Sequence, residues 1–242
     1  MQKSEYRNIF ENEENHFYYR AINGLVLDII KREGVKSDAR ILDAGCGTGG
    51  LLKLLSNFEA EGVDISLEAL KFCKLRVAKA KQGSLEKLPF RDKSFEAVIS
   101  IDVIYHKYVK DDFQVMKELS RVLKPNGLLI LRAPAFKHLT SDHDEVVMTR
   151  WRYTSKELKN LAQRTWFQIK QVSYLNLSLF LGSLLSRGGR GSSVKRVHPV
   201  VNAIGLMVLN FENWLVVKMK MTLPFGQGVL LVAEKRGFFV NS

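Results

Sequence analysis

The sequence predicts an α/β fold with a mostly parallel sheet and helices on both faces of that sheet. Short β-prone runs alternate with helical patterns from residue 40 to residue 135, as expected where a crossover helix follows each strand. Residues 41–50, ILDAGCGTGG, insert a glycine turn between a strand and a helix. Ligands bind beyond the carboxyl ends of the strands in such sheets, so we expect a site at that edge. Four polar residues lie at or just after the ends of predicted strands there: Asp43, Asp64, Ser84 and Asp102.

Elements of the first half are predicted from apolar spacing and helix caps. Apolar residues that recur every three or four positions indicate helices, and short β-prone runs indicate strands. Ser66 is typical of a helix N-cap. The predicted helices are 16–33, 51–57 and one that begins after Ser66; the predicted strands are 40–43, 61–64 and 79–82.

The second half continues the alternation. EAVIS at 96–100 is a nearly continuous β-prone run, as in a strand buried on both faces. Thr154 and Glu157 have the spacing of a capping box at a helix start. The predicted helices are 111–123 and one from Thr154 to Arg164; the predicted strands are 95–101, 128–132, 166–175 and 228–235.

Composition limits the class of protein. A chain of 242 residues with 46% hydrophobic residues suits one globular domain. The net charge of +12 favours an anionic neighbour such as nucleic acid, a membrane surface or an acidic substrate. Cys46 and Cys73 are isolated thiols without a Cys/His cluster, so we expect no metal site and a reducing compartment. The N-terminus lacks an apolar signal segment, so a cytoplasmic location is expected, with peripheral membrane contact as an option.

Residues 176–227 exceed what a minimal sheet needs between its last two strands. The segment combines apolar stretches with six basic residues and one acid, Glu212. Asn202, Asn210 and Asn213 interrupt its longest apolar stretch, which disfavours a spanning helix. A long connection in a compact domain is usually functional or has its own structure. We therefore expect two apolar-faced helices joined by a basic loop, acting as a lid.

The glycine turn fits two ligand classes. Gly45, Gly47 and Gly50 match the dinucleotide pattern G-x-G-x-x-G. With Asp43 just before the turn, Gly45, Gly47 and Gly49 also match D-x-G-x-G-x-G. An acid at that position would repel the pyrophosphate of a dinucleotide but would attract a cationic ligand.

The second pattern resembles motif I of the class I S-adenosylmethionine (SAM) methyltransferases. Four further segments resemble that family in order: ENHFYYRA at 14–21, GVDIS at 62–66, QGSLEKLPFRDKSFEAVIS at 82–100 and VLKPNGLLIL at 122–131. The N-terminal segment is similar to bacterial members of the methyltransferase-11 type. The resemblance implies a Rossmann-like, mostly parallel seven-stranded sheet with an antiparallel last strand, a helical insertion before that strand, and SAM as cofactor. It covers about 15–135 well.

The resemblance also implies roles for the residues at the strand ends. Asp64 would accept hydrogen bonds from the ribose hydroxyls, because one carboxylate can accept two. Ile65 would pack on adenine, and Ser84 stands where the family usually has an acid that contacts the adenine amine. The expected cofactor-binding residues are Asp43, Gly45, Cys46, Gly47, Gly49, Asp64, Ile65, Ser84, Leu85 and Asp102.

The acceptor side is less defined. His106, after the fourth strand, and His143, on a later loop, are candidate bases for an acceptor that must lose a proton. A structural or orienting role for each histidine remains open. The candidate acceptor-binding residues are His16, Tyr19, Asp144, Arg152 and Tyr153.

We therefore expect one methyltransferase domain over 1–242, with a helical cap at 1–33 and a lid at 176–227. The expected reaction is transfer of a methyl group, by O-methylation, to a small-molecule, lipid-linked or glycan acceptor. The motifs N/D-P-P-[YFW] and Pro-Cys are absent from the sequence, which disfavours methylation of nucleic-acid bases by those routes. An RNA-directed methyltransferase and a non-catalytic or NAD-type Rossmann protein remain as alternatives.

Overall fold

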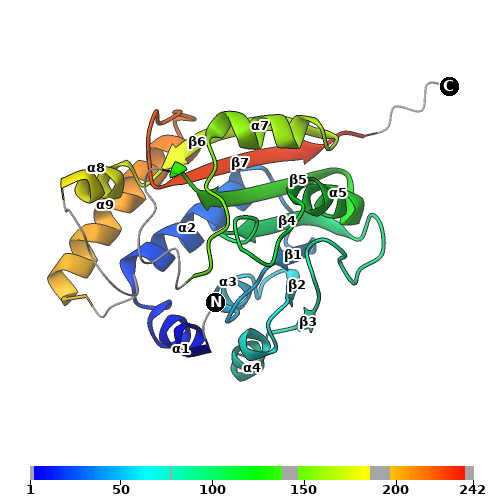
Figure 1. Ribbon diagram of the computed structural model, residues 1–242, viewed down its shortest axis with the longest axis horizontal. Helices are drawn as coiled ribbons and strands as arrows, with labels where there is room; N and C mark the ends of the chain where they lie inside the picture. The colour runs from blue at the N-terminus through cyan, green and yellow to red at the C-terminus, as the bar shows by residue number, and fades with distance from the viewer. Residues whose placement is uncertain (1–2, 77, 138–146, 186–196, 238–242) are drawn as a thin grey trace.

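The computed structural model describes residues 3–76, 78–137, 147–185 and 197–237 (Figure 1). Its centre is a seven-stranded sheet with the order β3-β2-β1-β4-β5-β7-β6. β1 to β5 are parallel, whereas β7 is antiparallel to both β5 and β6. This arrangement confirms the predicted fold, including the antiparallel last strand. The strands are β1 (Arg40–Ala44), β2 (Glu59–Asp64), β3 (Ala80–Gln82), β4 (Phe95–Ile101), β5 (Leu123–Pro134), β6 (Phe167–Leu175) and β7 (Gly228–Lys235).

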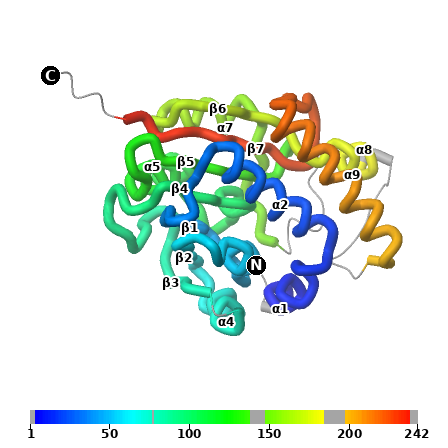
Figure 2. The backbone as a smooth tube through the Cα atoms, turned by 180° about the vertical axis from the view of Figure 1, so that it is seen from behind, coloured from blue at the N-terminus to red at the C-terminus, as the bar shows by residue number. Residues whose placement is uncertain are grey.

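Helices cover both faces of the sheet. α5 and α7 lie on the face that is turned to the viewer in Figure 1, and α2 and α9 run side by side on the other face, seen in Figure 2. The helices are α1 (Lys3–Asn12), α2 (Phe17–Arg32), α3 (Gly50–Leu54), α4 (Leu67–Leu75), α5 (Asp112–Val122), α7 (Ser155–Gln163), α8 (Leu177–Leu185) and α9 (Pro199–Val217).

The clearest differences from the expected element boundaries are in β5 and α3. β5 begins at Leu123 instead of residue 128, because Leu123 pairs with Phe95 before the register shifts between Phe95 and Ala97. α3 ends at Leu54 and is shorter than the 51–57 helix that the leucine spacing predicts. Local apolar spacing does not report either feature, because one depends on pairing across the sheet and the other on the end of a short helix.

Caps explain where the predicted helices begin. Ser66 accepts a hydrogen bond from the Ala69 N–H at the start of α4, and Thr154 with Glu157 forms the expected capping box of α7. His16 caps α2 through its Nδ1 atom, which accepts from the Tyr18 N–H at 3.3 Å. The N-terminal segment therefore consists of two helices, α1 and α2, that are separated by a turn at residues 13–16.

The 176–227 segment contains the two expected helices, α8 and α9. The Glu212 carboxylate on α9 accepts hydrogen bonds from the N–H groups of Leu177 and Ser178, at 2.9 and 2.8 Å. The only acid of the segment thus caps the first turn of α8, as anions at helix N-termini do.

Strand register brings the polar residues to one edge. Asp43 pairs with Gly62 on β2 and with Ile99 on β4. β1 and β4 form the crossover point of the strand order, and their central side chains are buried on both faces. In sheets of this type the crossover point is where a ligand binds beyond the carboxyl ends of the strands.

Candidate functional site

The glycine turn requires glycine at two positions for different reasons. Gly45, Gly47 and Gly49 all have positive φ angles, of 93°, 53° and 83°. A Cβ atom on Gly45 would lie 2.2 Å from Cγ2 of Val103, whereas nothing lies within 4 Å of a Cβ on Gly47. The chain at Gly45 therefore passes directly against the loop after β4, and Gly47 needs only the unusual backbone conformation.

Two carboxylates stand at the ends of β1 and β2. Asp43 is 3% exposed, and burial, together with the charges of Asp64 and Glu13, raises its pKa to about 7. Asp64 accepts hydrogen bonds from the Gly47 N–H at 2.9 Å and the Ser66 N–H at 2.8 Å. Burial raises the pKa of Asp64 as well, although these N–H groups oppose the shift. The site therefore concentrates negative potential around the glycine turn, which suits a cationic ligand.

Three residues are expected to contact adenine, and the structure leaves Ile65 the most exposed of them. Ile65 is 42% exposed beside the site, so its side chain is available to pack on a flat ring. The Ser84 hydroxyl accepts from the Glu86 N–H at 3.2 Å and stabilises the loop after β3. The Leu85 side chain is buried in the main core, which leaves its backbone as the group that can face a ligand.

The two cysteines are structural neighbours. Their Sγ atoms are 3.9 Å apart, and the Cys73 thiol donates to the Gly47 carbonyl at 3.2 Å. The contact with Cys73 and burial raise the pKa of the Cys46 thiol. Both residues are buried free thiols that attach α4 to the glycine turn. Within the described ranges no group of three His, Cys, Asp or Glu side chains could hold a metal ion.

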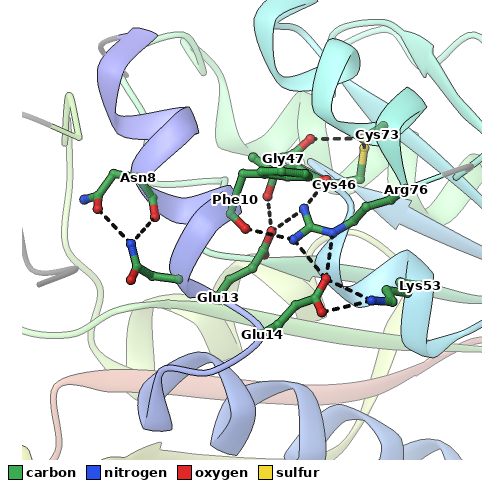
Figure 3. A network of polar contacts seen from close by, with 11 residues as sticks. Asn8, Phe10, Glu13, Glu14, Cys46, Gly47, Lys53, Cys73 and Arg76 are labelled. Atoms are coloured by element: carbon green, nitrogen blue, oxygen red, sulfur yellow. Dashed lines mark hydrogen bonds and ion pairs between the residues drawn. The ribbon is translucent and has the colours of Figure 1, made fainter. Parts of the chain in front are cut away.

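The N-terminal segment closes over the glycine turn through Glu13, which the sequence did not single out (Figure 3). Glu13 is buried, accepts from the Thr48 hydroxyl and lies 2.7 Å from Nη1 of Arg76. Arg76 also donates to the carbonyls of Thr48 and Phe10, at 2.8 and 3.1 Å, and its guanidinium lies 4.2 Å from the Phe10 ring centre. One arginine therefore joins α1, α4 and the turn.

An ion pair between a buried arginine and a half-buried aspartate occupies the ends of β4 and β5. Arg132, at the end of β5, pairs with the Oδ2 atom of Asp102, which directly follows β4 and has a φ of 56°. The Tyr18 ring lies 5.5 Å from the Arg132 guanidinium. Burial alone would lower the pKa of Arg132, but Asp102 and Tyr18 raise it above its usual value. Sequence reasoning missed Arg132 and Tyr18, although a single arginine inside the apolar run LLILRAP is a usable signal.

His106 lies at the acceptor edge but is held as a neutral imidazole. Burial lowers its pKa to about 4. Its Nδ1 atom accepts from the Tyr108 N–H at 3.3 Å, so the ring proton of the neutral form is on Nε2. An Nε2–H group donates a hydrogen bond and cannot accept a proton. This geometry favours an orienting role for His106.

The other candidate acceptor residues divide into two groups. Tyr19 and Arg152 are half-buried near Tyr18, and Arg152 donates to the Ala135 carbonyl at 3.1 Å. His16 is occupied as the cap of α2, and its pKa is lowered by burial.

Tyr153, a candidate acceptor-binding residue, has a structural role. It is buried, and its hydroxyl donates to Asp112 at 2.5 Å, which together with burial raises its pKa. His143 and Asp144 lie outside the described residues.

A shallow depression lies at the opposite edge of the sheet. Its lining includes Glu33, Lys36, Glu96 and Asn126, which surround the amino ends of β1, β4 and β5. Ligands of this fold bind at the carboxyl edge, so this depression is separate from the candidate site.

Comparison with known proteins agrees with the geometry. Residues 42–131 match the family model Methyltransf_11, described as a methyltransferase domain. A tRNA (carboxymethyluridine(34)-5-O)-methyltransferase from Arabidopsis thaliana is 32% identical over 120 residues, which cover 49% of this chain and 30% of that protein. A sterol 4-C-methyltransferase from Caenorhabditis elegans is 31% identical over 121 residues, covering 46% and 36%.

A solved structure has the same fold over most of the chain. Phosphoethanolamine N-methyltransferase 2 from Haemonchus contortus, in complex with SAM, aligns with a TM-score of 0.58 at 20% identity, over 87% of this chain and 52% of that one. The chain spans less than half the length of the first curated relatives that it matches, 39% and 44% in two cases.

The fold and the glycine-turn site together define a class I methyltransferase domain. Residues 42–131 match a methyltransferase-domain family model, and the fold is shared with a SAM-bound methyltransferase, so SAM is the cofactor with which the site is compared. The residues fit that cofactor: the turn allows close approach, Asp43 and Asp64 suit its ammonium and ribose hydroxyls, and Ile65 is exposed for adenine.

Proposed function

We propose that the protein transfers the methyl group of SAM to a hydroxyl oxygen of a small amphiphilic acceptor, such as a lipid-linked, glycan or other small molecule. The observation that carries this proposal is the Asp102–Arg132 pair at the ends of β4 and β5. Oδ1 of Asp102 and Nε of Arg132 are buried and have no hydrogen-bond partner among the residues that the structure describes. Each such atom costs about 1–3 kcal/mol, so a ligand that pairs them would be favoured.

A hydroxyl group has the matching chemistry, because it donates one hydrogen bond and accepts others. Oδ1 of Asp102, which the family resemblance instead places among the cofactor-binding residues, accepts the acceptor's O–H, and Nε of Arg132 donates to its oxygen. The Tyr18 side chain covers the pair and must turn aside for an acceptor to enter. Tyr19 and Arg152 border the same space and hold the rest of the acceptor.

Catalysis in this arrangement is mainly positioning. When bound, SAM supplies a methyl group that its sulfonium has already activated. Asp43 and Asp64 would hold the cofactor, while Asp102 and His106 would orient the acceptor oxygen. SAM would supply the methyl group and leave as S-adenosylhomocysteine, and Asp102 would take the hydroxyl proton and pass it to solvent.

Tritium-labelled methyl transfer tests the class of acceptor. The protein is incubated with methyl-labelled SAM and, separately, with a panel of phenols and hydroxyquinones, a hydroxylated lipid extract and total tRNA. We expect alkali-stable label in an organic-soluble product, and at least about a tenfold loss of label with Asp102→Asn. Label that appears in the tRNA alone would overturn the proposal.

An RNA acceptor is the second candidate, favoured by the net charge of +12 and by the tRNA methyltransferase among the relatives. Binding of tRNA would then weaken steeply with salt, because phosphate contacts release counterions. A filter-binding series with total tRNA at two salt concentrations separates this candidate from the first. Calorimetry with SAM, S-adenosylhomocysteine and NAD provides the matching check on the cofactor.

A further inference from the structure

The outer side of α9 is apolar along its whole length. Five side chains spaced three or four residues apart form one line, which we call the α9 stripe, and each is exposed: Val200, Ile204, Met207, Phe211 and Trp214. Met207 and Phe211 are 66% and 60% exposed. A surface helix of a globular protein normally places polar residues on its outer side. Contiguous exposed apolar surface of this kind marks an interaction site.

Two polar residues of α9, Asn202 and Asn213, point inward and hold the helix in this orientation. Asn202 accepts from the Phe17 N–H at 2.8 Å and donates to the Asn15 carbonyl at 2.9 Å. Asn213 donates to the Ala21 carbonyl at 2.9 Å. Rotation of α9 to bury the stripe would break these contacts with α2. The α9 stripe is therefore a fixed outer surface of the domain.

α9 is also long and apolar enough to cross a membrane by length and composition alone, within the described part of the chain. Its inward hydrogen bonds to α2 instead keep it alongside the domain (Figure 2). A helix attached in this way can lie in the plane of a membrane surface, with one side in the lipid.

Charge at this surface favours an anionic partner. Lys218 continues the stripe by one further turn, and Lys220 follows it; both are exposed. The single acid in 199–227, Glu212, caps α8. Met219, Met221 and Phe225 extend the exposed apolar surface beside these lysines. Apolar side chains with an aromatic pair, flanked by lysine and free of acid, are the composition of a helix that binds an anionic lipid surface.

A row of aromatic rings links this surface to the acceptor edge. Phe136, just after β5, stacks on Tyr174 with ring centres 4.7 Å apart and lies 6.0 Å from Phe180 of α8. Phe180 stacks in turn on Phe225, which is 52% exposed, at 6.0 Å. Packed aromatic rings therefore connect the exposed apolar surface to the end of β5.

We propose that the α9 stripe, with Lys218 and Lys220, docks the protein on an anionic lipid bilayer. α9 lies in the interface with Met207, Phe211 and Trp214 below the headgroups and the two lysines at the anionic phosphates. Docking deepens the proposed function by presenting an amphiphilic acceptor at the carboxyl edge, but it does not require catalysis. Vesicle binding without SAM and label transfer can therefore fail independently.

Co-sedimentation tests docking, with vesicles of phosphatidylcholine alone and of phosphatidylcholine mixed with phosphatidylserine, at low and high salt. We expect binding to the mixed vesicles only, weakened by salt. Met207→Ser with Phe211→Ser should weaken binding at least about tenfold, since each side chain loses apolar burial. The matched control, Leu67→Ser with Leu75→Ser, removes two exposed apolar side chains from α4 and should leave binding unchanged.

Reversing the charge of the two lysines beside the stripe is the second test of docking. Lys218→Glu with Lys220→Glu should abolish the preference for phosphatidylserine, whereas Lys156→Glu with Lys159→Glu, on exposed positions of α7, should preserve most of it. Near-ultraviolet circular dichroism checks that each variant is folded. Absence of wild-type binding to the mixed vesicles, or equal losses in stripe and control variants, would overturn the proposal. So would a concentration-dependent dimer that the stripe variant dissociates, because a second copy would then occupy the stripe.

Discussion

Nη1 of Arg76, which ends α4, lies 2.7 Å from Oε1 of Glu13, which joins α1 to α2. The same carboxylate accepts from the Thr48 hydroxyl beside the glycine turn. This contact makes the N-terminal segment part of the cofactor site (Figure 3). The Glu13–Arg76 pair therefore holds the N-terminal segment against the glycine turn.

Glu13→Gln should weaken the contact between the N-terminal segment and the glycine turn. The substitution removes the buried partner of Arg76 and leaves the half-exposed Glu14, 3.3 Å away, as its remaining carboxylate; losing one partner of a fully enclosed pair costs about 3–5 kcal/mol. We expect faster amide exchange in α1 and a SAM dissociation rate increased by about tenfold or more. Hydrogen exchange and stopped-flow displacement measure the two effects. Glu59→Gln is the matched control: it removes the same charge from an exposed pair with Arg40 at 3.9 Å, and both rates should stay within about twofold.

Asp43 should make SAM binding depend on pH. Burial, with the charges of Asp64 and Glu13, raises its pKa from 3.8 to about 7. The folded protein therefore keeps this proton over a range in which the unfolded chain has lost it. The contribution of Asp43 to stability is greatest at low pH and declines as the pH rises from about 4 to about 7. A cationic ligand favours the carboxylate, so SAM affinity should rise up to about pH 7, with proton release below that pH.

Calorimetry in buffers of different ionisation enthalpy measures this proton release. Asp43→Asn keeps the side-chain shape, and it should bind SAM more weakly at about pH 8 and show no proton release at about pH 6. Equal proton release by the wild type and the variant would assign the titration to another group.

The fold could be predicted from the sequence because its signals are local. Strand composition, the glycine turn and the caps at Ser66 and Thr154 each report a short segment, and the structure has them where expected. Glu13 and Arg76 could not be paired in this way, because they are 63 residues apart and ordinary charged residues by composition. For Leu85 the motif predicts more than the structure has. Its place in the family motif suggests a ligand contact, whereas its side chain packs in the core.

His106→Gln should reduce methyl transfer only modestly. Loss of a general base typically lowers the rate by about 10²–10⁴. The pKa of about 4 and the Nδ1 contact with Tyr108 instead predict a donor role, so we expect a loss of about tenfold or less. The profile of kcat from about pH 5.5 to 8 should keep its shape, measured with the acceptor that label transfer identifies. His198→Gln is the control, since His198 likewise accepts a backbone N–H through Nδ1, at the start of α9. A loss above about a hundredfold confined to His106→Gln would restore the base assignment.

Gly45→Ala should destabilise the domain through both backbone strain and steric overlap. The residue has a φ of 93°, and the added Cβ would lie 2.2 Å from Val103 Cγ2 in the loop that precedes His106. We expect the free energy of unfolding to fall by about 1–3 kcal/mol in urea titrations. Gly24→Ala provides the contrast, because Gly24 lies within α2 and its Cβ would meet nothing within 4 Å. That change should raise the free energy of unfolding by about 0.5–1 kcal/mol, since alanine favours a helix. If both variants unfolded at the wild-type urea concentration, the close approach of the glycine turn to the loop after β4 would be wrong, and with it the shape of the cofactor site.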